Sequence, residues 1–321
     1  MGNRIAFAVI YYGPVPDYLP VFLAGAKRNR HLDFVFFTDW EKLPVEGENI
    51  FNCRLPMSEF NRIAVEKGIL RRKLTHGYKL CDLKPAWLDI LEEYFPEDKY
   101  EYAGYIDIDM LLGRMDKYIS MDTLAEYDLW TLYDSFIAGP CTLFRNNRMM
   151  RRLYRNAECW KSVFDSPSFF AFDEMLQIAA DDCTTLESFT DVVAEAERDG
   201  IVKVKRNNGI SFEDRPVIIH YDRGTIVDGK GREYMCFHYF VSKHSLLWKS
   251  PDWQDVPDEF YVNKFGFFRH KNRPVTLGRI LISPSHLKQV ARKMINRRRD
   301  IFKHLKNTNL KKLVELIKNQ L

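Results

Sequence analysis

Two carboxylates one residue apart are the first candidates for chemistry in this chain. Asp107 and Asp109 directly follow residues 101–106, a short apolar segment that predicts a buried strand. Side chains at such a strand end can leave the sheet together, and carboxylate oxygens are ligands that suit Mg²⁺ or Mn²⁺. A cation held there can neutralise a diphosphate leaving group. A turn with solvated carboxylates gives the same pattern, so the rest of the chain has to separate these two interpretations.

The composition is that of a soluble globular protein. The chain has 321 residues, of which 46% are hydrophobic and 29% charged, enough for one large domain with an appendage or for two domains. The six cysteines form no C-x-x-C pair and no zinc-site spacing, which favours reduced thiols and a cytoplasmic protein. No run approaches the ~18 apolar residues that a membrane span needs. Residues 5–12 are too short for the core of a signal peptide.

The charge is distributed unevenly along the chain. Residues 285–321 contain eleven Lys or Arg and two Asp or Glu, a net charge of +9, whereas the whole chain carries +4 and the remainder therefore −5. Apolar residues recur in this segment at helical spacing, and a basic amphipathic helix favours an anionic membrane surface. We therefore expect a peripheral protein on the inner face of the cell membrane, with a merely solvated helix as the alternative. No nucleic-acid module is recognisable, so nucleic acid is not an expected partner.

The N-terminal part predicts a β-α-β unit, and therefore an α/β protein with parallel strands. Residues 5–11 and 33–39 are apolar runs typical of strands buried on both faces, and residues 18–28 between them predict a helix. Further strands are expected at 49–54, 101–106, 128–133, 141–144, 201–205, 216–221 and 232–240. Further helices are expected at 85–94, 147–160, 173–180 and 186–198, and residues 249–274 read as an aromatic loop.

The carboxyl ends of the first two strands carry candidate binding residues. Tyr11, Tyr12 and Gly13 end the first strand and could flank a nucleobase, and Asp39 ends the second and could accept hydrogen bonds from a base or ribose. Ligands of parallel sheets bind at this edge. Packing of both tyrosines in the core is the alternative.

Three short segments together carry a family resemblance. They are residues 78–85 (YKLCDLKP), 105–109 (YIDID) and 142–147 (TLFRNN). In this order and spacing, the chain resembles a bacterial polysaccharide-biosynthesis glycosyltransferase family with a GT-A fold and a D-x-D motif, over residues 4–245. It is more distantly similar to the galactosyltransferases that build lipopolysaccharide and capsule. The resemblance implies a GT-A-like, Rossmann-type mixed sheet flanked by helices, followed by the basic C-terminal helical tail.

The resemblance also implies roles for single residues. Asp107 and Asp109 would hold Mn²⁺ or Mg²⁺ against the two phosphates of a nucleotide sugar, so that Asp107 also belongs to the donor site. His238 would complete the metal shell, and Lys243 would touch the diphosphate. Imidazole and ammonium groups suit these tasks. A histidine that simply packs in an aromatic strand is the alternative for His238.

Two further groups are candidates on either side of the D-x-D motif. By the resemblance, Asp82 and Lys84 contact the donor sugar and the diphosphate, with Lys79 as a lesser candidate; an N-cap Asp with a solvent-facing Lys is the alternative. Asp173 and Glu174 open a predicted helix after an aromatic loop, and they could bind sugar hydroxyls or act as a general base. Acidic residues also favour helix N-termini without any function.

These observations predict a three-part chain. Residues 1–248 would form the GT-A glycosyltransferase domain, residues 249–284 an aromatic loop-rich extension, and residues 285–321 the basic amphipathic tail. The expected activity is metal-dependent transfer of a sugar from a UDP-sugar to a glycan or lipid-linked acceptor of capsule or O-antigen synthesis. The alternative is a non-catalytic, membrane-associated nucleotide- or glycan-binding protein with a degenerate site. A D-x-D phosphatase is disfavoured because Met110 follows the second aspartate.

Overall fold

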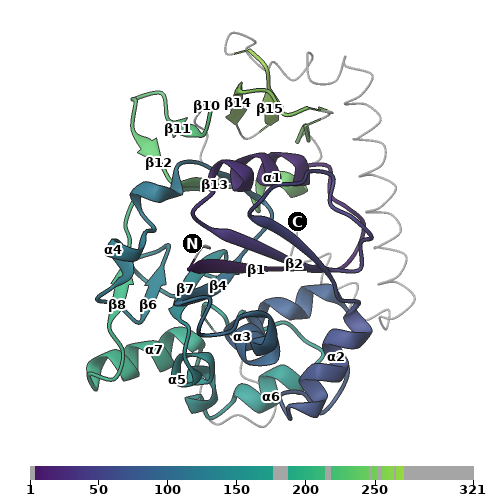
Figure 1. Ribbon diagram of the computed structural model, residues 1–321, viewed down its shortest axis with the longest axis vertical. Helices are drawn as coiled ribbons and strands as arrows, with labels where there is room; N and C mark the ends of the chain where they lie inside the picture. The colour runs from purple at the N-terminus through teal and green to yellow at the C-terminus, as the bar shows by residue number, and fades with distance from the viewer. Residues whose placement is uncertain are drawn as a thin grey trace, which may run out of the picture.

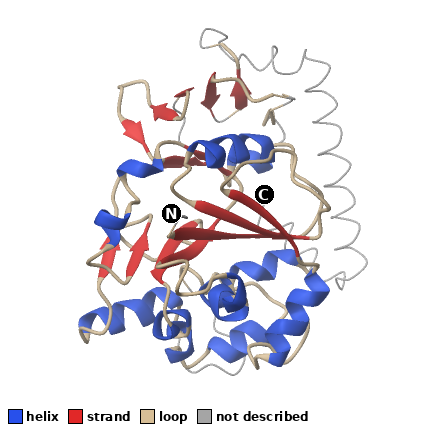
Figure 2. Cartoon of the chain, in the orientation of Figure 1, coloured by secondary structure: helices blue, strands red, loops and turns tan. Residues whose placement is uncertain are grey.

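A seven-stranded mixed sheet forms the centre of the protein (Figures 1 and 2). The computed structural model describes residues 4–175, 187–213, 218–245, 248–251, 253, 255–263 and 265–270. In spatial order the strands are β3 (Ile50–Arg54), β2 (Asp33–Thr38), β1 (Ile5–Tyr11), β4 (Tyr102–Ile106), β7 (Cys141–Arg145), β6 (Leu129–Thr131) and β8 (Val204–Arg206). The first four are parallel, and β7 runs antiparallel to both β4 and β6. The expected α/β class, a mixed sheet flanked by helices, is confirmed.

Alternate residues of β1 face two different hydrophobic cores. Ala6, Ala8 and Ile10 pack into the core on one face of the sheet, and the intervening apolar residues pack into the core on the other face. Both faces are therefore dry, which explains why the sequence of this strand is continuously apolar instead of alternating.

Helices cover both faces of the sheet (Figure 1). In that view α1 (Leu19–Arg28) lies above the sheet. Below it lie α2 (Met57–Glu66), α3 (Trp87–Ile90), α5 (Arg148–Arg151), α6 (Trp160–Asp165) and α7 (Phe189–Arg198). The short α4 (Met121–Leu124) begins with a capping box at Ser120. The layers leave the carboxyl ends of β1 and β4 accessible for a site.

Two smaller sheets complete the described chain. The five-stranded sheet contains β12 (Glu233–Tyr234), β11 (Thr225–Val227), β10 (Ile219–Asp222), β14 (Glu259–Asn263) and β15 (Gly266–Phe268) in that order. It shares a core with Val21 of α1. The three-stranded sheet contains β5 (Met110–Leu112), β13 (Cys236–His238) and β9 (Ser211–Glu213).

Several expected elements differ in the structure. Residues 249–274, expected to be a loop, contain β14 and β15, because antiparallel pairing with β10 supplies their hydrogen bonds. The helix expected at 147–160 is replaced by α5, the 3₁₀ turn η5 (Leu153–Asn156) and the first residue of α6, and Arg152 and Arg155 in this segment both donate to the buried carboxylate of Asp89. The strand expected at 232–240 is divided into β12 and β13, which join different sheets.

The helix expected at 85–94 is also divided. It consists of the 3₁₀ turn η2 (Lys84–Ala86), α3 and the 3₁₀ turn η3 (Glu92–Tyr94). Residues 176–180 of another expected helix and the basic segment 285–321 lie outside the described residues. In the part of the chain that the structure describes, no helix combines the length and the apolar character needed to cross a membrane.

Gly104 in β4 allows an unusually close approach of β7. A Cβ atom on Gly104 would lie 1.9 Å from the carbonyl oxygen of Thr142. Since that oxygen belongs to the backbone of the central sheet, it cannot move aside as a side chain could. We expect Gly104→Ala to lower the free energy of unfolding by at least about 1–3 kcal/mol, as overpacking of a core does, in urea denaturation.

The matched control is Gly229→Ala. Gly229 has no heavy atom within 4 Å of the added Cβ, so its substitution should change stability by no more than about 0.5 kcal/mol. Equal stability of the two variants would contradict the packing argument for β4.

Candidate metal and nucleotide site

The D-x-D carboxylates lie in the short connection between β4 and β5. β4 ends at Ile106 and β5 begins at Met110, so Asp107 and Asp109 leave the sheet at its carboxyl edge. The backbone N–H of Asp107 donates to the Pro140 carbonyl at 2.9 Å and fixes the start of the connection. Asp109 is 5% exposed, whereas Asp107 is half-buried and accessible.

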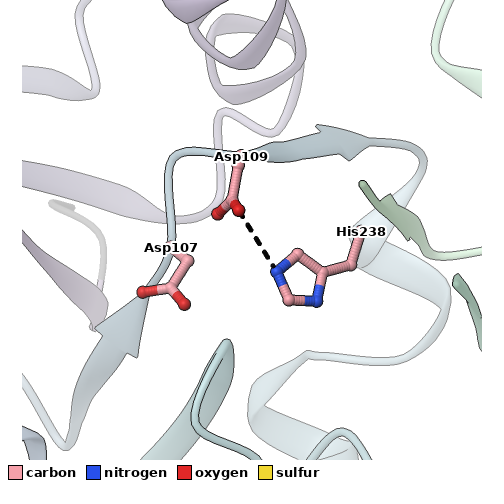
Figure 3. Close-up of side chains that lie close together, drawn as sticks. All are labelled: Asp107, Asp109 and His238. Atoms are coloured by element: carbon pink, nitrogen blue, oxygen red, sulfur yellow. Dashed lines mark ion pairs between the residues drawn. The ribbon is translucent and has the colours of Figure 1, made fainter. Parts of the chain in front are cut away.

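His238 reaches these carboxylates through strand pairing. β13 runs antiparallel to β5, with His238 opposite Met110, and the N–H of Tyr239 donates to the Asp109 carbonyl at 3.2 Å. Figure 3 shows the two carboxylates and the imidazole turned toward a common space. One ligand atom from each of Asp107, Asp109 and His238 lies within 4.8 Å of the others. The structure therefore brings together the three residues expected to bind a metal.

This group of side chains suits a hard divalent cation. Two carboxylates and one imidazole are the oxygen and nitrogen donors that Mn²⁺ and Mg²⁺ accept, and the ligand atoms are close enough to reach one ion. The backbone pairing of β13 with β5 holds the imidazole in place. The residues present therefore fit the cation that the sequence implies.

Lys243 lies against the same carboxylate. It belongs to the 3₁₀ turn η6 (Ser242–His244), and its Nζ is 2.5 Å from Oδ2 of Asp109, while Nε2 of His238 is 3.5 Å from that oxygen. Burial by itself raises the pKa of Asp109, but the charges and hydrogen bonds of His238 and Lys243 outweigh burial and hold the pKa well below its usual range. Asp109 is therefore a carboxylate ion throughout the neutral range.

Lys84 connects three segments of the site. Its Nζ donates to the Asp107 carboxylate at 2.9 Å and to the Gly139 carbonyl at 2.8 Å, and it lies 3.6 Å from Oδ2 of Asp173. Burial disfavours the ammonium form, but Asp107 and Asp173 raise the pKa of Lys84 well above its ordinary value. The lysine therefore stays charged, and its contacts orient Asp107.

Gly139 makes room for the acidic pair Asp173 and Glu174. Its N–H donates to Oε1 of Glu174 at 2.9 Å. A Cβ atom at Gly139 would lie 2.6 Å from Oδ2 of Asp173 and 2.8 Å from Oε1 of Glu174, so only glycine permits this approach. Burial raises the pKa of both acids, and it raises that of Asp173 well above the usual value although Lys84 opposes the shift. Sequence reasoning gave Gly139 no role, although its position before Pro140 and an apolar strand was a signal of a special backbone.

All these groups face one cavity of about 830 Å³. Of the expected site residues, the cavity is lined by Tyr11, Tyr12, Lys84, Asp107, Asp109, Asp173, Glu174, His238 and Lys243. Seven aromatic residues that were not expected there also line it, namely Tyr18, Tyr78, Trp87, Tyr133, Phe136, Phe169 and Phe240. The ring of Tyr78 is exposed and contacts Phe169, with their centroids 4.7 Å apart. An exposed aromatic ring at the cavity is suited to contact a ligand.

Gly13 and Asp39 lie outside the described lining of the cavity. The Gly13 carbonyl accepts a hydrogen bond from Nε1 of Trp40 at 2.7 Å, and the Trp40 ring contacts Tyr11. Gly13 has a φ of +133°, which favours glycine at this turn. Asp39 is exposed at the end of β2, where its charge raises the pKa of Tyr12 in addition to the larger effect of burial. The backbone of Gly13 thus holds Trp40, whose ring contacts Tyr11 in the lining of the cavity.

Lys79 and Asp82 have a different place from the one expected. They form a buried ion pair at 2.7 Å on one side of the 3₁₀ turn η1 (Gly77–Cys81), turned away from the cavity. Lys79 also donates to the carbonyls of Val163 and Ser168, both at 2.6 Å. Asp82 accepts the N–H groups of the loop at Phe170 and Phe172. The structure thus gives the pair a role that the sequence did not predict, since it fastens the loop that leads to Asp173, and the donor contact expected of the two residues stays a prediction.

Removing one member of this buried pair tests its structural role. Lys79→Met leaves the Asp82 carboxylate buried without its ammonium partner, and losing one partner of a buried pair costs about 3–5 kcal/mol. We expect a loss of this size in the free energy of unfolding, measured by urea denaturation. Lys203→Met, which breaks an exposed pair with Glu126, should cost about 0–1 kcal/mol. A similar small loss in both variants would contradict the assignment.

The solved structures to which this chain has a distant likeness include three of glycosyltransferases. A crystal structure of the galactosyltransferase LgtC with donor and acceptor sugar analogues has a TM-score of 0.35 at 13% identity, and one of an LgtC active-site mutant has 0.35 at 12%; each covers 65% of this chain and 75% of LgtC. The glycosyltransferase GlyE of Streptococcus pneumoniae has a TM-score of 0.27 at 10% identity, covering 66% of this chain and 68% of GlyE. Likenesses of this size carry no information about activity.

No curated protein matches the sequence. Residues 7–269 match the model of DUF6625, which is described as a family of unknown function. Because the match spans well over half of the chain, this protein belongs to the DUF6625 family.

Proposed function

We propose that this protein is a metal-dependent glycosyltransferase that moves a sugar from a nucleoside-diphosphate sugar, with UDP as the nucleotide, to a hydroxyl group of a glycan or lipid-linked oligosaccharide. The observation that carries the proposal is the group Asp107, Asp109 and His238 at the carboxyl edge of the sheet, facing a cavity of about 830 Å³. Ligand pockets for small molecules span about 300–1,000 Å³, so the cavity has the size for a nucleotide sugar.

The donor would lie between the two charged parts of the cavity. Asp107, Asp109 and His238 would hold Mn²⁺ or Mg²⁺, and the cation when bound supplies electrostatic stabilisation of the charge that develops on the departing diphosphate. Lys243 adds a mobile point charge for the phosphate oxygens. Lys84 acts through Asp107, whose carboxylate it orients.

The nucleoside and the acceptor would occupy opposite ends of the cavity. Tyr11 and Tyr12 line its wall beyond β1, where a base and ribose can pack against the rings. Asp173 and Glu174 lie on the other side of Lys84, where carboxyl oxygens can bind sugar hydroxyls. Burial raises the pKa of both acids, which makes each carboxylate a better acceptor of a hydroxyl proton, so both are candidates for a general base.

The sequence resemblance supports a more specific role. It suggests acceptors of capsule or O-antigen synthesis, which are carried on lipid at the cytoplasmic face of the membrane. The charge of +9 on residues 285–321 against −5 on the remainder supports a peripheral location there, because each basic residue near an anionic leaflet contributes about 1 kcal/mol.

Asp109→Asn tests the proposed cation site. The change keeps the side-chain size but removes the negative charge that faces His238, so we expect Mn²⁺-dependent hydrolysis of UDP-sugars to fall by more than about 100-fold. The assay is release of UDP across a panel of UDP-sugars, with and without a chelator. Asp116→Asn, an exposed acid paired with Arg114 outside the cavity, is the control and should keep full activity. Wild-type rates in Asp109→Asn, or undiminished rates in excess chelator, would refute the metal-dependent reaction.

Deletion of residues 285–321 tests the membrane location. The truncated protein should keep its UDP-sugar hydrolysis but lose co-sedimentation with anionic liposomes at low salt, because its remaining charge is negative. Neutral liposomes and high salt are the controls, and both should release the full-length protein. Equal liposome binding by the full-length and truncated proteins would show that the basic segment is not the anchor.

A further inference from the structure

The carboxylates of the site already have two internal counter-ions. Lys84 contacts Asp107 and Lys243 contacts Asp109, so each of the two carboxylates already has an ammonium partner. A divalent cation that bound to both carboxylates would lie close to these two ammonium groups. Like charges a few ångströms apart in a partly buried site repel one another strongly. Binding of the cation would therefore be unfavourable unless a lysine moved away or an anion bound with it.

Lys243 and the proposed cation need the same oxygen. Lys243 Nζ lies 2.5 Å from Oδ2 of Asp109, the oxygen that also faces Nε2 of His238 at 3.5 Å. An ion held by both Asp109 and His238 would lie beside this oxygen, too close to an ammonium group that stays in place. Lysine and cation are therefore direct competitors for Asp109.

Of the two lysines, Lys243 is the one that can leave. The Lys84 side chain is 4% exposed and is held by acceptors from three segments, Asp107, Gly139 and Asp173. The Lys243 side chain is 21% exposed, lines the cavity and has a flexible four-carbon stem. A change of its torsion angles can carry the ammonium group from Asp109 into the cavity while the backbone of η6 stays in place.

We propose that Lys243 takes the place of the metal ion in the empty site. Its ammonium group pairs with Asp109 when no cation is bound, and it moves to the diphosphate when the cation and the diphosphate bind together. This inference rests on the proposed function, since it needs a site for both ligands. Its consequence is positive coupling: the cation binds weakly alone and much more tightly with a diphosphate, and the diphosphate shows the same coupling toward the cation.

The test measures binding, with the full-length protein and two probes. Mn²⁺ alone is titrated and the unbound ion is followed by electron paramagnetic resonance. The titration is then repeated with saturating inorganic pyrophosphate, which contains the diphosphate group without a base or sugar. Lys243→Met removes the competing charge and keeps the stem, so it should bind Mn²⁺ alone about tenfold more tightly than the wild type. The gain in Mn²⁺ affinity that pyrophosphate gives should shrink by about the same factor.

Two variants serve as controls. Lys243→Arg keeps the positive charge and should keep both the weak binding of Mn²⁺ alone and the coupling. Lys117→Met breaks an ion pair with Glu233 outside the cavity and should behave as the wild type. If Lys243→Met were to lose its fold, as judged by circular dichroism, Lys243→Gln provides the same comparison with a polar side chain.

The outcomes separate this inference from the function on which it rests. Unchanged or weaker binding of Mn²⁺ alone to Lys243→Met, in a protein that binds Mn²⁺ with pyrophosphate, would overturn the role of Lys243 and leave the glycosyltransferase proposal standing. Failure of the wild type and the variant to bind Mn²⁺ under either condition would overturn both. Binding of Mn²⁺ alone by the variant but not by the wild type would support the inference in its strongest form.

Discussion

The site depends on the antiparallel pairing of β13 with β5. This pairing places residues of the C-terminal part beside the D-x-D connection, since Lys243 and Asp109 are 134 positions apart in the sequence but share an ion pair. The register is strict, because a shift of one residue would turn His238 to the opposite face of the strand. Once His238 lies opposite Met110, the imidazole, the ammonium group and both carboxylates are all directed into one cavity.

Some charged residues near this pairing line the cavity, and others stabilise the loops around it. Asp107 and Asp109 face the cavity from the end of the buried strand β4, whereas Lys79 and Asp82 use their charges to fasten the segment 163–172, which contains the end of α6 and the loop after it. Both pairs are close in sequence and contain carboxylates, but only one faces the cavity. Burial of a charge is therefore no guide to its function unless its partners are known.

The sequence predicted the features that depend on neighbouring residues and missed contacts between residues far apart in the chain. The apolar strands and the D-x-D pair are local features, and their periodicity and position at a strand end revealed them. His238 and Lys243 came from family resemblance, since no local pattern indicates which late strand pairs with β5. The two carbonyl groups to which Lys79 donates lie 84 and 89 positions away, so its role in fastening the loop was not visible in the local sequence. Likewise, Asp89 accepts hydrogen bonds from Arg152 and Arg155, 63 and 66 positions away, and no local pattern indicates these contacts.

Gly139 has a further consequence. Its carbonyl oxygen accepts from Lys84, which holds Asp107, and its N–H donates to Glu174, so the two polar groups of a single residue lie between the halves of the cavity. A displacement of a few tenths of an ångström in this loop would lengthen both hydrogen bonds at once. The backbone of this one glycine therefore couples the position of Glu174 to that of Lys84, and through Lys84 to the carboxylate of Asp107.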